Sequence, residues 1–220
     1  MKKIIPLILV IIIPVIANGQ KACLPTKIES KNYTCTLEYN TSNQLVKVSD
    51  NNDYVVKLEY NQNGKVAKYE VYDAGELEEW YTVKKGVIEE YDEDGLSRTF
   101  RYKYNEQGKL SAIVIRDKDG NELNRKRFTW QKGNIVETIY KGKRGTKKRQ
   151  YKYDNKPNPL RVLRPIANFV KFKPAAVFSK NNIVERTHTK SKSFSGSYSK
   201  TNCPLVFAKN NNQNYLEFTY

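Results

Sequence analysis

Clustered cations are the side chains of this 220-residue sequence with the clearest potential for chemistry. Residues 141–200 carry 17 Lys and Arg against 2 Asp and Glu, whereas residues 20–140 carry 19 against 20. The formal net charge of +16 is therefore concentrated in one stretch, and aromatic residues lie within it. Cations interleaved with aromatic rings are typical of surfaces that bind polyanions. The candidate polyanion-binding residues are Lys141, Lys143, Arg144, Lys147, Lys148, Arg149, Arg161, Arg164, Lys171 and Lys173.

The partner that these cations predict depends on the compartment. Outside the cell, it would be an anionic polysaccharide, lipopolysaccharide phosphate, an anionic membrane surface or extracellular DNA, and we expect no specific nucleic-acid recognition. The alternative is a basic face that is only solvated. Net charge informs partners and solubility rather than fold.

Catalytic side chains do not fall into the patterns that catalysis requires. The only histidine, His188, lies in a Ser/Thr/Lys-rich stretch, and the sequence has no Gly-x-Ser-x-Gly elbow and no phosphate-binding glycine loop. The carboxylate pairs Glu78-Glu79 and Glu89-Glu90 are neighbours on predicted strands, so their side chains point to opposite faces. We expect no enzyme, no catalytic residues and no cofactor.

Two acidic turns could hold calcium loosely. Asp92-Glu93-Asp94 and the segment Asp117 to Glu122 lack the ligand spacing of a calcium loop, and ordinary turn chemistry explains them. One histidine and no close cysteine pair argue against zinc. We therefore expect no metal site.

The N-terminal segment predicts export. Met1-Lys2-Lys3 precedes an apolar run from Ile4 to Ala17, which is shorter than the roughly 20 residues of a spanning helix. This pattern is typical of a secretory signal peptide, here residues 1–19, cleaved before Gln20. We expect the mature chain in the periplasm, at the cell surface or secreted, with the outer membrane as the alternative.

Three cysteines follow the predicted cleavage site, and an oxidising compartment allows one disulfide and one free thiol. Cys23–Cys35 would close a short N-terminal loop. Cys35–Cys203 would tie the first predicted strand to the last segment, which suits a closed sheet, and we take Cys35 and Cys203 as the candidate disulfide. Lipidation of Cys23 fits poorly, because Lys21 lies just before it.

Regular turns predict the architecture that must position these residues. The sequence places turn glycines at 64, 75, 86, 95, 108, 120, 133 and 145, and stretches such as Phe100-Arg101-Tyr102-Lys103-Tyr104 alternate with period two between them. Both features indicate antiparallel strands joined by tight turns. We predict an all-β, antiparallel up-and-down meander of about 12–14 strands, curled or closed into a barrel, because a flat sheet of that size is rare.

We expect residues 20–220 to form a single domain. Residues 33–160 are the hairpin array, and residues 161–220 are a basic extension, a cover and a closing strand. A barrel of about twelve strands encloses more space than its own side chains fill, so a ligand, water or part of this chain must occupy it. The candidate plug is the segment Leu160 to Phe178, whose prolines Pro165 and Pro174 exclude a long helix.

Three of the repeat units carry a resemblance to known proteins. The matching residues are Tyr102-Lys103-Tyr104-Asn105 with Gly108-Lys109-Leu110, Phe128-Thr129-Trp130 with Gly133-Asn134, and Tyr151-Lys152-Tyr153-Asp154-Asn155-Lys156 with Asn158-Pro159. They resemble the tyrosine–aspartate (Rhs-type) repeats of large secreted bacterial proteins, and more closely a family of small exported bacterial proteins of unknown function. The resemblance implies a porin-like antiparallel β-barrel or meander, and it brings no catalytic residues.

The last residues leave two alternatives open. Leu216, Phe218 and Tyr220 share one face of a predicted closing strand, which is also how many outer-membrane barrels end. Spanning strands need about 9–11 residues, and most strands predicted here have about seven. We therefore expect an exported cell-envelope protein with a non-enzymatic structural or binding role, which contacts anionic glycan or lipid through residues 141–173. The alternative is an integral outer-membrane β-barrel.

Overall fold

The computed structural model describes residues 23–31, 33–167, 174–188, 191–199, 203–209 and 215–220. The strands in these residues are β1 (Lys27–Ser30), β2 (Tyr33–Tyr39), β3 (Leu45–Asp50), β4 (Val55–Tyr60), β5 (Val66–Asp73), β6 (Glu76–Lys84), β7 (Val87–Asp92), β8 (Gly95–Tyr104), β9 (Leu110–Asp117), β10 (Glu122–Gln131), β11 (Asn134–Gly142), β12 (Gly145–Pro157), β13 (Asn181–Thr187), β14 (Ser191–Tyr198), β15 (Pro204–Lys209) and β16 (Tyr215–Thr219). A 3-10 helix, η1 (Pro159–Ile166), and a short α-helix, α1 (Pro174–Phe178), lie between β12 and β13.

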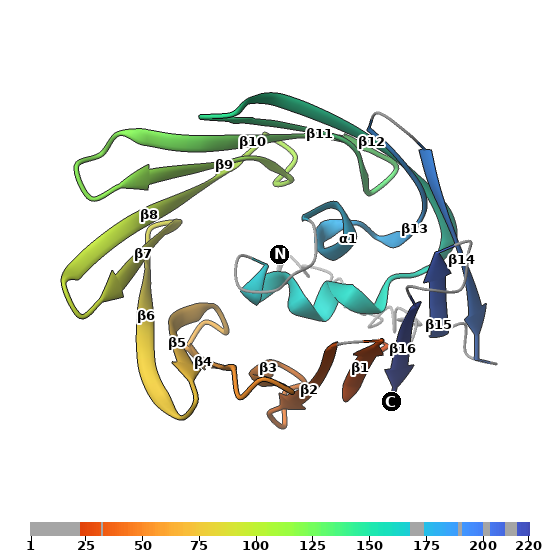
Figure 1. Ribbon diagram of the computed structural model, residues 1–220, viewed down its shortest axis with the longest axis horizontal. Coiled ribbons are helices and arrows are strands. Elements are labelled where there is room, and N and C mark those ends of the chain that lie inside the picture. Colours follow the sequence, from red (N-terminus) through yellow and green to blue (C-terminus); the bar gives the residue numbers. More distant parts are fainter. Residues whose placement is uncertain (1–22, 32, 168–173, 189–190, 200–202, 210–214) are drawn as a thin grey trace, which may run out of the picture.

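The strands form one antiparallel ring in sequence order (Figure 1). Each strand pairs with its neighbours along the chain, and β1 also pairs with β16, where Ile28 lies opposite Phe218. The predicted all-β up-and-down meander is confirmed. The strand count exceeds the expected 12–14, because β1 and β15 lie outside the array of regularly spaced turns from which that number was derived.

Asparagine side chains shape the repeated turns. Asn105 accepts hydrogen bonds at Oδ1 from the backbone N–H groups of Gln107 and Lys109, at 3.1 and 2.9 Å. Asn61 and Asn40 make the same pair of bonds in their own turns. The asparagine therefore closes the turn locally, which explains its recurrence after an aromatic residue.

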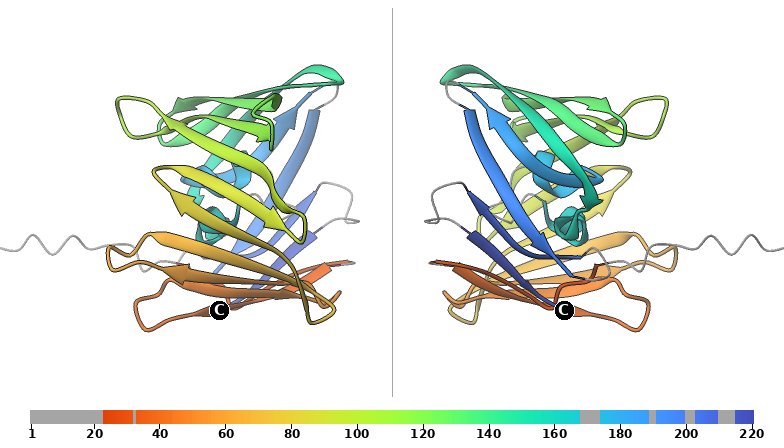
Figure 2. Two further views of the ribbon diagram at one scale, coloured as in Figure 1. Left: turned by 90° about the vertical axis from the view of Figure 1, so that its left-hand side faces the viewer. Right: turned by 90° about the vertical axis from the view of Figure 1, so that its right-hand side faces the viewer.

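Successive turns alternate between the two ends of the ring, which the side views show (Figure 2). The asparagine turns at residues 40–44, 61–65 and 105–109 lie at the end through which the chain leaves β12, called the plug end. The β11–β12 hairpin turn lies at the other end, called the distal end. The strands thus place the basic hairpin far from the residues that follow Pro157.

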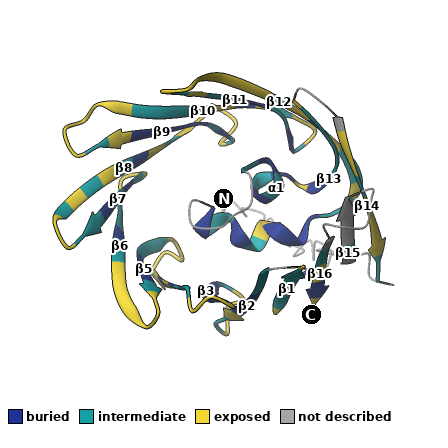
Figure 3. Cartoon of the chain, viewed as in Figure 1, coloured by how far each residue is buried: buried dark blue, intermediate teal, exposed yellow. Residues whose placement is uncertain are grey.

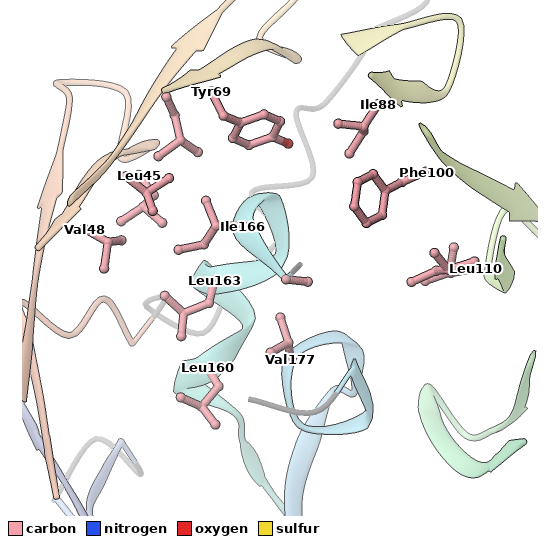
Figure 4. Packing of buried hydrophobic residues seen from close by; sticks show 14 of the residues in the cluster. Leu45, Val48, Tyr69, Ile88, Phe100, Leu110, Leu160, Leu163, Ile166 and Val177 are labelled. Atoms are coloured by element: carbon pink, nitrogen blue, oxygen red, sulfur yellow. The ribbon is translucent and has the colours of Figure 1, made fainter. Parts of the chain in front are cut away.

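Helices η1 and α1, together called the plug, lie inside the ring (Figures 1 and 4). Leu163, Ile166 and Val177 are fully buried there against inward-facing side chains of the strands. The hydroxyl of Tyr69 on β5 donates a hydrogen bond to the Pro165 carbonyl at 2.7 Å. Part of the chain itself therefore occupies the interior, and Figure 3 shows the plug as one of the most buried parts of the molecule.

Asn158 directs the chain from β12 into the ring. Its Nδ2 donates to the carbonyls of Ala176 and Ser179, at 2.6 and 2.9 Å, and its Oδ1 accepts from the N–H of Leu160 at 3.0 Å. The Asn158 side chain is buried, so these bonds satisfy groups that have no access to water. The Asn-Pro step that ends the hairpin array thus also fastens η1 to α1.

The disulfide joins Cys23 and Cys203, with a Cα–Cα distance of 5.6 Å. The predicted Cys35–Cys203 pairing is wrong. Cys35 lies on β2 opposite Ile28, is 2% exposed, and is a free thiol in the core whose pKa burial raises to about 11. Cys23 and Cys203 precede β1 and β15, which both start at the plug end, so these two sulfurs meet there. A disulfide-bonded Cys23 has no thiol left for lipidation.

We expect the protein to lose stability as the pH rises above about 10. Burial raises the pKa of Tyr54 to about 12, and burial also raises the pKa values of Tyr69 and Tyr81. The unfolded chain releases these phenolic protons near the ordinary value of 10.0, so the folded state binds more protons above that pH. The stability that these three tyrosines contribute is therefore fully present below pH 10, and it is lost as the pH rises through about 12.

Denaturant titrations at about pH 8 and about pH 11 check this expectation. The unfolding midpoint should fall at the higher pH, and tyrosinate absorbance should appear later in the folded protein than in denaturant. Equal midpoints at the two pH values would contradict the assignment of these tyrosines as buried, protonated groups.

Candidate anion-binding groove

The ten predicted polyanion-binding residues do not form one surface. Six of them lie at the distal end, around the β11–β12 hairpin: Lys141, Lys143, Arg144, Lys147, Lys148 and Arg149. Arg161 and Arg164 lie on η1, inside the ring. Lys171 and Lys173 lie outside the described residues. The structure therefore splits the basic stretch between two places.

Strand alternation also divides the cations of β12. Lys147 and Arg149 lie opposite Tyr140 and Thr138 on the inner face, whereas Lys148 lies opposite Ile139 on the outer face. Consecutive residues of a strand point to opposite faces. A run of neighbouring cations in the sequence cannot therefore act as a single patch.

A groove with a volume of about 420 Å³ lies on the outer face of β10, β11 and β12. Its lining residues are Glu122, Arg125, Arg127, Ile139, Lys141 and Thr146. The register places Arg125 opposite Lys141 and Arg127 opposite Ile139. Arg125 and Arg127 are two residues apart on β10, so both point to the outer face. Three cations from two strands thus converge on one depression.

One carboxylate lies among these cations. Arg125 donates to Glu122 from Nε at 3.0 Å and from Nη2 at 2.5 Å. The hydrogen bond from Arg125 lowers the pKa of Glu122, and the charges of Arg125, Arg116 and Lys141 add to the effect. Glu122 is therefore ionised at neutral pH and compensates Arg125. In the described part of the chain, Arg127 and Lys141 have no ion-pair partner.

The hairpin tip extends the positive surface beyond the groove. Lys143 and Arg144 are exposed in the turn itself, and Lys148 forms an ion pair with Glu137 at 2.7 Å. No ion pair involves Lys143 or Arg144 within the ranges that the structure describes. An anion approaching this part of the distal end therefore meets cations whose charge is largely uncompensated.

Sequence reasoning missed the groove arginines. Arg125 and Arg127 lie in the stretch of balanced charge, and they meet Lys141 only through the pairing of β10 with β11. The signal that could have found them is the turn at Gly133, because counting outward from a hairpin turn gives the cross-strand partners.

A second charged cluster lies on the inner face and was also missed. Glu90 on β7 lies between Tyr81 on β6 and Arg98 on β8, and Arg98 donates to it from Nε at 2.7 Å. The hydroxyl of Tyr81 donates to Glu79, so the two carboxylates approach the same phenol. Glu79 and Glu90 come from the two adjacent carboxylate pairs of the sequence. The members of one pair point to opposite faces, but Glu79 on β6 and Glu90 on β7 come together across the two strands. Because Arg98 compensates the buried Glu90, we assign the cluster a structural role.

The remaining features considered are the histidine, metal-binding clusters and membrane-spanning helices. His188 is exposed, and its Nδ1 lies 2.8 Å from the Lys148 carbonyl oxygen. No group of three or more His, Cys, Asp and Glu side chains suited to a metal ion occurs among the described residues. None of the helices in the described ranges is long and apolar enough to cross a membrane.

The chain was compared with known proteins and solved structures. No protein-family model and no curated protein matches the chain. The crystal structure of a porin-like protein from Bacteroides uniformis is 14% identical, with a TM-score of 0.62, over 89% of this chain and 97% of that one. A porin-like protein from Bacteroides vulgatus is 13% identical over 90% and 98% of the two chains, with a TM-score of 0.46. A TcdB2-TccC3 structure matches 84% of this chain and 10% of its own, with a TM-score of 0.30.

These comparisons bear on fold rather than activity. The identities are low, and among the three structures named here the Bacteroides uniformis match is the one whose TM-score supports an argument. The Rhs-type repeat and the signal peptide stay predictions. The chain shares an antiparallel β-meander fold with a porin-like protein.

Proposed function

We propose that this is an exported cell-envelope protein with a non-enzymatic binding role, and that it contacts anionic polysaccharide or an anionic membrane surface at its distal end. The observation that carries the proposal is the convergence of Arg125, Arg127 and Lys141 on one outer-face groove that holds a single carboxylate. Guanidinium groups suit sulfate, phosphate and carboxylate groups because their donors form a planar fork.

The chemistry of the groove favours an extended anionic ligand over a small one. Its lining also includes the apolar side chain of Ile139 and the hydroxyl-bearing Thr146. The hairpin tip with Lys143 and Arg144 lies between the groove residues Lys141 and Thr146 in the chain. A polymer with repeated negative groups could contact the groove and the tip together. Such a ligand gains from several weak contacts at once.

The alternative of an integral outer-membrane barrel is less well supported. The outer face of the sheet carries ion pairs on many strands, among them Lys47–Glu38, Lys68–Glu70 and Lys152–Glu185. A lipid-facing barrel wall needs an apolar band, and charged side chains at its midplane are costly. Most of the buried apolar side chains here instead face the plug.

Neutralising the groove should weaken retention on immobilised heparin. We expect the variant carrying Arg127→Gln, Lys141→Gln and Lys143→Gln to elute at lower salt, with Kd raised between about threefold and about one-hundredfold, at roughly 0.2–1 kcal/mol for each exposed ion pair. These residues have no ion-pair partner among the described residues, so their replacement should not disturb the fold.

A charge-matched control separates a site from general basicity. Lys85→Gln, Lys103→Gln and Lys132→Gln remove three exposed cations at or near the plug end, away from the groove. This control should elute close to the unaltered protein. If both triple variants shift equally, binding depends on net charge alone and the proposed groove is wrong.

A membrane fractionation tests the location. Under the proposal, the protein leaves envelope membranes after a wash in high salt and carbonate. Retention in the membrane pellet after that wash would favour the integral barrel instead.

A further inference from the structure

A second cavity lies at the plug end, between the plug and the inner face of the ring. Its volume is about 310 Å³, and its lining includes Tyr69 and Tyr102 from the wall and Pro165 and Phe178 from the plug. Ligand-binding pockets start at about this size, so a small molecule would fit. Figure 4 shows Tyr69 and Ile88 pointing from the wall toward the interior that the plug occupies.

The walls of this cavity are apolar and aromatic. Ile88, Val66 and Val83 add branched aliphatic side chains to the rings of Tyr69, Tyr102 and Phe178. The Tyr69 hydroxyl donates a hydrogen bond to the Pro165 carbonyl, and this bond holds the Tyr69 ring in place as one side of the cavity. Such a surface favours the hydrocarbon or aromatic part of a ligand.

Among the residues that the structure describes, the charged ones that line the cavity are both cations, Arg164 and Lys65. Arg164 donates from Nη2 to the Phe178 carbonyl at 2.6 Å, whereas its Nε is buried and has no hydrogen-bond partner within the described ranges. Burial and the nearby charge of Arg161 lower the pKa of Arg164 to about 10, so it is protonated at neutral pH. No carboxylate among the described residues forms an ion pair with it.

A half-buried guanidinium without a counter-ion is costly. The protein retains this charge inside the ring, on a plug that is otherwise packed through apolar side chains. An anionic group seated beside Arg164 would recover part of that cost, and Lys65 at the adjacent turn would add a second attraction. The unused charge and the apolar walls point to the same kind of ligand.

We propose that the plug-end cavity binds a small amphiphilic anion, in which a carboxylate or sulfonate faces Arg164 and Lys65 and an apolar body packs against Tyr69, Ile88 and Phe178. This site is separate from the outer-face groove, because it lies inside the ring at the opposite end. It selects a single compact anion, whereas the groove suits a polymer.

Isothermal titration of the full chain with octanoate and with octanamide tests the proposal. The two probes have the same hydrocarbon body, but only octanoate is charged at neutral pH. We expect octanoate to bind at least about tenfold more tightly, because hydrogen bonds to charged groups are the stronger ones. Equal affinities, or no binding of octanoate to the folded protein, would overturn the proposal.

Two variants locate the site. Arg164→Gln combined with Lys65→Gln should reduce the preference for octanoate over octanamide to near unity. Val83→Trp, which fills the cavity from the wall, should abolish binding of both probes while circular dichroism still reports a folded sheet. Octanoate binding that survives Val83→Trp in a folded protein would place the ligand elsewhere and refute the assignment.

The groove variants serve as the control for this experiment. Arg127→Gln with Lys141→Gln and Lys143→Gln should leave octanoate affinity unchanged. A parallel loss of octanoate and heparin binding in that variant would mean that both anions use the outer face, and the plug-end site would then be wrong.

Discussion

Replacing Cys203 by serine is expected to lower the free energy of unfolding by about 2–5 kcal/mol. The disulfide spans 180 residues and links the segment before β1 to the segment before β15. A cross-link over a loop of that length removes much of the conformational freedom of the unfolded chain. It also holds together the part of the ring where β1, β16 and β15 meet.

Denaturant unfolding of Cys23→Ser, Cys203→Ser and the double variant measures this effect. Because either substitution breaks the same bond, the double variant should lose no more stability than each single variant, and reductant should lower the stability of only the unaltered protein. Additive losses, or a midpoint that reductant leaves unchanged in the unaltered protein, would contradict the Cys23–Cys203 assignment.

Shortening a buried side chain of the plug should lower stability by about as much as breaking the disulfide. Leu163→Ala is expected to lower the free energy of unfolding by about 2–5 kcal/mol, since it removes a fully buried side chain and leaves a cavity. Leu163 belongs to η1 and lies inside the ring, where inward-facing side chains of several strands contact the plug.

Leu77→Ala is the matched control, because Leu77 is 49% exposed on β6. We expect that substitution to change stability by no more than about 0.5 kcal/mol. If Leu163→Ala had an equally small effect, the ring would be stable without the plug, and η1 would be a loosely held segment rather than part of the core.

Much of the fold could be predicted from local chemistry. The glycines at 64, 108 and 120 adopt positive φ in turns, as their spacing indicates, and the alternation of Tyr102 with Lys103 correctly places one inside and one outside. These features are properties of a few adjacent residues. The turn conformation and the alternation of faces therefore depend on local residues and not on distant parts of the chain.

Contacts between distant segments were the least predictable part. The choice between Cys23 and Cys35 as the partner of Cys203 depends on which cysteine lies outside the strand ladder. The groove depends on the β10–β11 register, and the fate of Arg164 depends on the path of η1 into the ring. In each case, the outcome depends on which residues far apart in the sequence are brought together by the fold. Composition and local spacing do not determine these contacts.

The order of the strands has a consequence for how the chain reaches this structure. Nearly every strand pairs with the one just made, so each hairpin can form early and quickly from local contacts. The exception is the bond from the Thr26 N–H to the Thr219 carbonyl and the β1–β16 ladder beside it, which joins residues 193 positions apart. Closing such a long loop carries a large entropic cost before any contact rewards it. Ring closure should therefore be the late and slow event of folding, and until it happens β1 and β16 are open edges to which a second chain could add.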